Sequence, residues 1–217
     1  MIATKQGNVT LIGTAEGLED TPVSNEINIS ADDLHHIVIT PEISSITAGQ
    51  IQTYQAEAFD IHNNSLGYIT KETEFSIDND AEGAWNGPAY EAEIAGTWTV
   101  TGIYDGKIDT AELTVNHGPL NRFNIKRIDD QLIGIPFGIT IIAVDEYWNT
   151  VSSYNWVNTI SDSTGTISPT ITENFIEGRW TGEVTINKES NNVNINTTGS
   201  GIKSFSNVFD VLTNTPL

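Results

Sequence analysis

Apolar and polar residues alternate along most of this chain, with a period of two. The alternation is clear in residues 52–59 and 97–104, and a β-branched run occupies 36–40. Asp105-Gly106 separates residues 97–104 from a second alternating run at 111–115, which is the strongest hairpin signal in the sequence. No stretch of 12 residues has the stripe of an amphipathic helix. Because side chains in a strand alternate between faces, this pattern predicts an all-β protein.

The predicted strands recur in the same order. Ala58-Phe59-Asp60 followed by Asn64 matches Ala143-Val144-Asp145 followed by Asn149, and the two aspartates are 85 positions apart. A repeat of this length suits a β-sandwich module of about 100 residues. The sequence therefore predicts a tandem of β-sandwiches.

A third copy is only partly present. Residues 8–12 and 24–29 resemble residues 192–195 and 206–211, which close the last repeat. We therefore predict that residues 1–30 are the C-terminal strands of a preceding module, and that 31–117 and 118–217 are sandwiches, the second with a C-terminal linker. Two strands alone are marginally stable in water, so residues 1–30 must find a further partner.

The charge of the chain excludes several classes of partner. Nine basic residues face 29 acidic ones, which gives a formal net charge of −20. Such a field repels nucleic acids and anionic membrane surfaces. No apolar run approaches the length of a membrane span, so we expect no direct membrane insertion. Cysteine is absent, and with it disulfides and thiolate metal sites.

The second repeat also resembles a known family. The resemblance is carried by residues 141–154, 165–169, 178–186 and 206–211, and the first repeat is similar at 95–101 and 111–115. These segments resemble the prokaryotic Ig-like repeats of invasin- and intimin-type adhesins, S-layer proteins and other large surface proteins. The resemblance implies tandem Ig-like β-sandwiches, an extracellular location, and neighbouring modules or other copies of the protein as partners. Trp148 stands where such repeats usually have glycine.

No catalytic pattern is recognisable. The four histidines have no zinc-protease spacing, and no nucleophile-elbow sequence occurs. We therefore expect no catalytic residues and a protein that is not an enzyme.

Calcium is the one cofactor that the sequence suggests. Asp32 and Asp33 lie at a predicted junction, and Asp60 with Asn64 forms an oxygen-rich cluster in a predicted turn. Ca²⁺ takes six to eight oxygen ligands, which such clusters can supply. The alternative is structural, because Asp and Asn are also ordinary turn residues that bond the local backbone.

Aromatic residues offer a second kind of candidate site. Trp148 with Tyr147, and Trp85, fall in predicted turns, where loops at the end of a sandwich carry contacts with ligands. These residues are candidates for binding a glycan or a receptor. Trp98 and Trp180 lie in alternating runs and are expected in the core.

The sequence thus favours a structural role, as a spacer or assembly segment of a surface layer, sheath, fibre or adhesin stalk. Two alternatives stay open: a glycan- or receptor-binding adhesion module, and a decoration protein of a virus particle. Residues 1–30 could also complete the sheet of a neighbouring subunit by strand addition.

Overall fold

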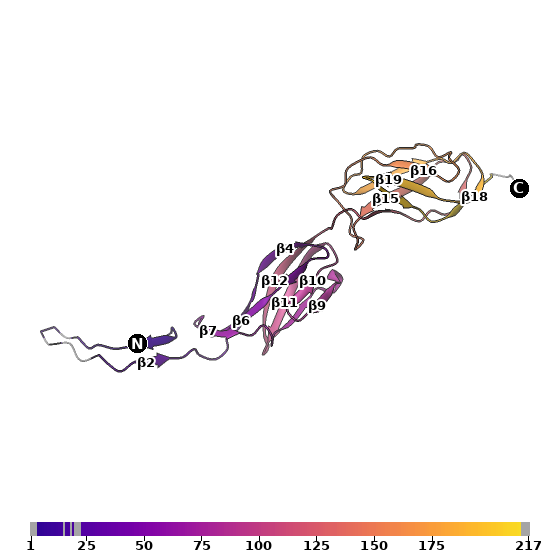
Figure 1. Cartoon of the computed structure of the whole chain (residues 1–217). Helices are drawn as coiled ribbons and strands as arrows, with labels where there is room; N and C mark the ends of the chain where they lie inside the picture. The colour runs from indigo at the N-terminus through magenta and orange to yellow at the C-terminus, as the bar shows by residue number, and fades with distance from the viewer. Residues whose placement is uncertain (1–3, 15, 18, 20–22, 214–217) are drawn as a thin grey trace. The chain divides into compact units, whose positions relative to one another are not determined.

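The structure is a computed structural model that describes residues 4–14, 16–17, 19 and 23–213. The last four residues of the predicted C-terminal linker, 214–217, lie outside this part of the chain. The described residues form strands joined by turns, with a single short 3₁₀ turn, η1 (Asn79–Ala81). The all-β prediction is confirmed, and the chain is a tandem of β-sandwiches (Figure 1).

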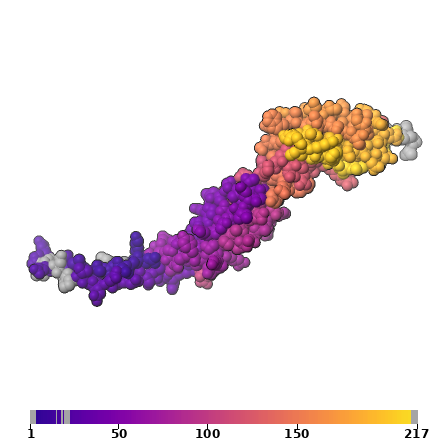
Figure 2. Space-filling model, in the orientation of Figure 1, coloured from indigo at the N-terminus to yellow at the C-terminus, as the bar shows by residue number. Residues whose placement is uncertain are grey.

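The chain divides into two compact units. Unit 1 contains residues up to 46, 50–92 and 96–114, and unit 2 contains 47–49, 93–95 and the chain from 115 onward. The short stretches 47–49 and 93–95 therefore belong to unit 2, although the residues on either side of them belong to unit 1. Figure 2 shows the main part of unit 2 in orange to yellow.

Unit 1 contains a four-stranded sheet in the order β4-β12-β11-β8 and two three-stranded sheets, β3-β6-β7 and β5-β10-β9. Its N-terminal strands, β1 and β2, form a separate two-stranded sheet. The strands are β1 (Gly7–Val9), β2 (Ile27–Ile29), β3 (His36–Thr40), β4 (Ile43–Thr47), β5 (Ile51–Thr53), β6 (Gln55–Phe59), β7 (Ser65–Tyr68), β8 (Glu74–Ile77), β9 (Ala84–Asn86), β10 (Ala89–Glu91), β11 (Gly96–Tyr104) and β12 (Lys107–Asn116).

The hairpin β11–β12 forms where the sequence predicts it. Asp105 and Gly106 both take positive φ, at 44° and 73°, which is the backbone that a two-residue hairpin turn requires. The alternating side chains place Val100 and Leu113 in the core, fully buried. Tyr54, between β5 and β6, and Tyr90 of β10 are buried as well.

Unit 2 contains three three-stranded sheets, in the orders β13-β15-β17, β14-β21-β18 and β16-β19-β20. Strand β14 pairs parallel with β21, whereas the pairs β13–β15, β15–β17, β16–β19, β18–β21 and β19–β20 are antiparallel. The strands are β13 (Arg122–Ile125), β14 (Gln131–Leu132), β15 (Phe137–Val144), β16 (Thr159–Asp162), β17 (Arg179–Val184), β18 (Ser190–Val193), β19 (Ile195–Gly199), β20 (Ile202–Phe205) and β21 (Phe209–Leu212).

The core of unit 2 gathers apolar side chains from all three sheets. Ile141, Val193, Ile195 and Val211 have no exposed surface, and Trp180 is 6% exposed, as its alternating run predicts. Trp98, the other tryptophan expected in the core, is only half-buried. Its ring packs over Gly96 of its own strand, where an added Cβ would lie 2.7 Å from the indole.

Candidate functional site: two Asp–Asn loops

The most distinctive polar site of unit 1 is the loop that follows β6. Both Asp60 and Asn64 are buried there, and the loop closes through a 3.0 Å hydrogen bond from the Asp60 N–H to the Asn64 carbonyl. Oδ1 of Asp60 accepts the backbone N–H groups of His62 and Asn64, each at 2.8 Å. This is the local pattern in which an aspartate side chain stands in for a backbone turn.

The second carboxylate oxygen of Asp60 reaches farther along the chain. Oδ2 accepts the backbone N–H of Asp32 at 2.9 Å and the side-chain amide of Asn64 at 2.8 Å. An ionised carboxylate offers about four acceptor positions, and here all four receive an N–H donor. Burial by itself would raise the pKa of Asp60, but hydrogen bonds from the Asn64 side chain and from the backbone of Asp32, Asn64 and His62 lower that pKa well below its usual range.

Asn64 continues the network to the stretch before β1. Its Nδ2 donates to the Thr4 carbonyl at 3.0 Å, and its Oδ1 accepts the Gln6 N–H at 3.0 Å. One asparagine thus binds an N–H and a C=O of the same short stretch. All the groups bound by this loop outside itself belong to the main chain.

Unit 2 repeats the network bond for bond. Oδ1 of Asp145 accepts the N–H groups of Tyr147 (3.0 Å) and Asn149 (2.8 Å), and Oδ2 accepts Gly118 N–H (2.6 Å) and the Asn149 amide (2.9 Å). Asn149 donates to the Glu93 carbonyl at 2.7 Å and accepts the Ala95 N–H at 2.8 Å. The stretch 93–95 stands before β11 as 4–6 stands before β1. The two loops, here called the Asp–Asn loops (60–64 and 145–149), are therefore equivalent.

The third loop residue after the aspartate has left-handed backbone in both copies. Asn63 has φ 61° and Trp148 has φ 69°. Glycine and asparagine adopt this conformation readily, whereas tryptophan does so at a cost. Trp148 therefore keeps the same turn as Asn63.

The predicted calcium ligands occupy this network. Asp60 and Asn64 are brought together, and Asp32 joins them through its backbone N–H, while the Asp32 side chain accepts the N–H of Asp33 at 2.9 Å. A cation at Asp60 would have to displace N–H donors from its carboxylate. In the described part of the chain, no three His, Cys, Asp or Glu side chains form a group able to hold a metal ion. Calcium binding stays a prediction.

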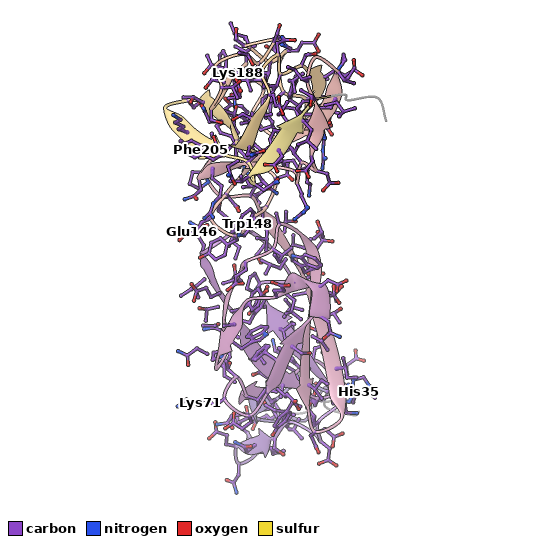
Figure 3. All side chains as sticks on the ribbon, turned by 90° about the vertical axis from the view of Figure 1, so that its right-hand side faces the viewer. His35, Lys71, Glu146, Trp148, Lys188 and Phe205 are labelled. Carbon is purple, nitrogen blue, oxygen red and sulfur yellow. The ribbon has the colours of Figure 1, made fainter. Side chains whose placement is uncertain are left out.

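The three predicted aromatic binding residues do not form one site: Trp148 and Tyr147 belong to unit 2, and Trp85 belongs to unit 1. Trp148 lies on the second Asp–Asn loop and is 57% exposed, with the Arg122 guanidinium 4.7 Å from its ring centre. Figure 3 shows Trp148 and Glu146 at one end of unit 2 and Lys188 at the other. Tyr147 is half-buried against Gly49, where an added Cβ would lie 2.9 Å from the tyrosine oxygen.

The placement of Trp85 in a turn is wrong. Trp85 belongs to β9 and packs among Tyr54, Phe75 and Tyr90, with its ring 5.0 Å from that of Tyr90. The neighbouring Asn86-Gly87-Pro88 suggested a turn, but the turn begins only at Gly87, after the strand has ended at Asn86. A role for Trp85 in binding stays a prediction.

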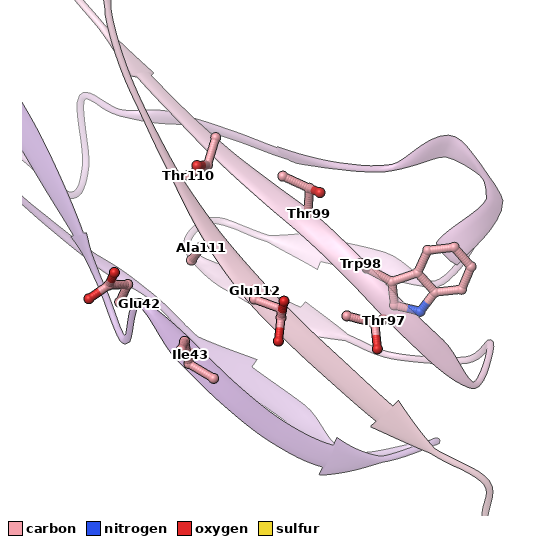
Figure 4. A pocket seen from close by; sticks show the side chains of 8 residues that line it. All are labelled: Glu42, Ile43, Thr97, Trp98, Thr99, Thr110, Ala111 and Glu112. Carbon is pink, nitrogen blue, oxygen red and sulfur yellow. The ribbon is translucent and has the colours of Figure 1, made fainter.

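A surface groove in unit 1 and the burial of Asp162 in unit 2 were not predicted from the sequence. A groove of about 370 Å³ lies over β4, β11 and β12, lined by Trp98, by the carboxylates of Glu42 and Glu112, and by threonines (Figure 4). In unit 2, Asp162 accepts the N–H groups of Thr164, Thr166 and Ile167. Burial would raise the pKa of Asp162, but hydrogen bonds from the Thr164 hydroxyl and from these backbone groups lower it.

Comparison with known proteins identifies no family. No protein-family model matches the chain, and no curated protein matches its sequence. Among solved structures, domains 1–6 of the surface layer protein SbsC match with a TM-score of 0.35 and 14% identity, over 96% of this chain and 32% of that one. At this identity the likeness concerns the fold alone.

Enzymes are also among the similar structures. A β-glycosidase from Bacteroides vulgatus has a TM-score of 0.38 and 11% identity, over 83% of this chain and 25% of that one. The Bacteroides uniformis β-glucuronidase 3 has a TM-score of 0.32 and 12% identity, over 80% and 24%. The chain thus spans about a third of the SbsC chain and about a quarter of each glycosidase. The prediction that this chain is not an enzyme is therefore corrected, because glycosidases contain regions of similar architecture.

In the described residues, no helix is long and apolar enough to cross a membrane.

Proposed function

We propose that this chain is a structural segment of a large cell-surface protein. In this proposal, Ig-like modules at about 31–117 and 118–213 serve as a spacer or assembly part of a surface layer, sheath, fibre or adhesin stalk. The observation that carries the proposal is the repetition of the Asp–Asn loop. A network of six hydrogen bonds recurs around Asp60 and around Asp145 with the same atoms in the same roles.

The network suits a chain of repeated modules for a physical reason. Each loop binds the stretch before a hairpin (4–6 or 93–95) and the linker that follows the hairpin (Asp32 or Gly118). A buried carboxylate is stable when all its acceptor positions receive hydrogen bonds. Without these donors, the unpaired buried charge would strongly destabilise the fold. The same device can therefore recur at every step of a tandem array.

The expected partners are neighbouring modules or other copies of the same protein. The net charge of −20 disfavours anionic polymers and surfaces as alternative partners.

The location is tested on intact cells of the source organism. Brief trypsin treatment should release peptides of this chain while a cytoplasmic marker protein stays uncut. If these peptides appear only after the cells are lysed, the surface location is wrong. Omitting trypsin, with the same incubation and wash, controls for protein that is shed spontaneously.

A second candidate function rests on Trp148. An indole that is 57% exposed on a loop can stack on a sugar ring or insert into a receptor, and Arg122 covers one of its faces. Replacing Trp148 with alanine should then abolish retention on a glycan array without unfolding unit 2. Equal retention of the parent chain and the variant would reject glycan binding at this loop.

A further inference from the structure

The N-terminal hairpin presents an apolar face without a core behind it. Strands β1 and β2 pair only with each other among the described residues. Val9 is 39% exposed, Leu11 56% and Ile27 43%. A two-stranded hairpin is marginal in water, and such side chains gain free energy when a partner covers them.

Unit 2 contains the same hairpin in a finished state. The Ser24 N–H donates to the Leu11 carbonyl at 2.8 Å, and the Leu11 N–H donates to Ser24 Oγ at 2.8 Å. Around Ser206 the equivalent bonds join its N–H to the Ile195 carbonyl at 2.8 Å and the Ile195 N–H to its Oγ at 3.0 Å. Each serine hydroxyl then donates to the carbonyl of the asparagine that follows it, at 2.9 Å for Ser24 and 2.7 Å for Ser206.

This match assigns a buried counterpart to each of the three exposed side chains Val9, Leu11 and Ile27. The counterparts of Val9, Leu11 and Ile27 are Val193, Ile195 and Phe209. Val193 and Ile195 have no exposed surface, and Phe209 is 4% exposed, all within the core of unit 2. The apolar face of the hairpin is therefore a core face.

The match also indicates what lies beside β2. In unit 2, Oδ1 of Asn207 accepts the Ile128 N–H at 2.8 Å, and its Nδ2 donates to the Ile128 carbonyl at 2.7 Å. The chain then continues into β14, which pairs parallel with β21. Asn25, the counterpart of Asn207, is exposed, and its side chain has no hydrogen-bond partner in the described part of the chain.

We propose that β1 and β2 are the last hairpin of a further β-sandwich, whose remaining strands belong to the polypeptide that precedes residue 4. A strand of that sandwich runs parallel to β2 and offers one N–H and one C=O to Asn25. The inference rests on the tandem-module part of the proposed function and is independent of its cell-surface location.

Two observations favour the preceding polypeptide over a second copy of this chain. In both units the body of the sandwich comes before its last hairpin, and Asn64 holds 4–6 as Asn149 holds 93–95. The strands in the position of the missing neighbour, β4 and β14, each pair with the last strand of their own module, β12 and β21.

The experiment adds the strands that the proposed sandwich lacks in this chain. A copy of residues 118–187 is fused directly before residue 4 of the full chain, and hydrogen exchange is followed by mass spectrometry in residues 8–12 and 24–29. In the fusion these amides should exchange at least about tenfold more slowly than in the 217-residue chain, since each 1.4 kcal/mol of protection gives a factor of ten. The same fusion carrying Asn25→Ala and Leu11→Asp should lose this protection. Unchanged exchange in the parent fusion would overturn the proposal.

A second measurement uses the chain without any fusion. Leu11→Asp should leave the thermal unfolding of both units unchanged, because the hairpin face that carries Leu11 has no core behind it in this chain. Ile195→Asp should abolish the unfolding transition of unit 2. A Leu11→Asp variant that lowers the unfolding temperature of unit 1 would overturn the proposal. So would a dimer in light scattering that Leu11→Asp dissociates, since a second copy would then be the partner.

Discussion

Asp145 Oδ2 accepts a 2.9 Å hydrogen bond from the side-chain amide of Asn149, and Asp60 and Asn64 repeat it at 2.8 Å. In both pairs the asparagine amide also donates to a backbone carbonyl outside the loop. The carboxylate therefore orients the asparagine, and the asparagine holds a separate stretch of chain.

Replacing Asp145 with alanine should destabilise unit 2 by about 3 kcal/mol. The change leaves the N–H groups of Gly118, Tyr147 and Asn149 without their acceptor, and each buried unsatisfied group costs about 1–3 kcal/mol. The loss of stability is measured by urea unfolding, with hydrogen exchange of the amides in unit 2 as the readout. Asp129→Ala is the matched control, because its side chain is 84% exposed and its ion pair with Arg127 lies at the surface. Equal stability of the two variants would contradict the role assigned to Asp145.

Acid should weaken both units through named carboxylates. The pKa of Asp60 and that of Asp162 are lower in the folded chain than the value of about 3.9 expected when unfolded. A carboxylate with a lowered folded pKa contributes stability that is complete above the unfolded pKa and is lost as the pH falls toward the folded pKa. At pH values below about 4, the unfolding temperature of both units should therefore decrease.

Asparagine substitutions separate the two contributions to this acid limb. Asp60→Asn should flatten the pH dependence of unit 1 below about pH 4, and Asp162→Asn should do so for unit 2. Thermal unfolding scanned from neutral to acidic pH provides the measurement. An acid limb that is identical in the parent chain and in the double variant would show that other groups cause it.

Gly199→Ala should destabilise unit 2 by about 2 kcal/mol or more, by overpacking. A Cβ at this position would lie 1.9 Å from Asn158 Oδ1 and 2.3 Å from the Tyr154 hydroxyl. Asn158 is fully buried and bonded to both Tyr154 and Thr197, so it has little freedom to move. Gly138→Ala is the control, since nothing lies within 4 Å of its Cβ position. Chemical unfolding of both variants should separate them clearly.

The left-handed backbone at Trp148 makes an unusual substitution acceptable. Trp148→Gly should change stability by less than about 1 kcal/mol, because relief of a strain of about 1–3 kcal/mol offsets the lost contact with Arg122. Trp148→Val should cost more, since a β-branched side chain is a poor fit to φ 69°. Unfolding temperatures measured side by side decide the matter. A glycine variant less stable than the valine variant would refute the strain argument.

The strands were largely predictable because alternation reflects burial directly. Residues 36–40 form β3 as expected, and the Asp105-Gly106 turn joins the two longest strands. The spacing of Asp60 and Asn64 was equally visible. Their chemistry was not, since a carboxylate that faces N–H donors and one that faces a cation have the same sequence signature. Tertiary contacts decide between them.

Other features depend on neighbours that the sequence does not place. The strand that contains Trp85 is so short that the adjacent Asn-Gly-Pro sequence predicted a turn instead. Contacts in the aromatic cluster around Tyr90 nevertheless hold Trp85 in a strand. Asp162 stands in an ordinary Asp-Ser-Thr-Gly segment, and only the fold buries it. Burial of a polar residue is set by long-range packing and leaves little local trace.

The Asp–Asn loops contact the stretches 4–6 and 93–95 only through backbone atoms. Those stretches read Thr-Lys-Gln in one case and Glu-Ile-Ala in the other, without a shared residue. Gene duplication can therefore copy a module, and mutation can then change the sequence of the contacted stretch without breaking the bonds. The network requires one aspartate and one asparagine in each module, and it sets no requirement on the side chains of the contacted stretch.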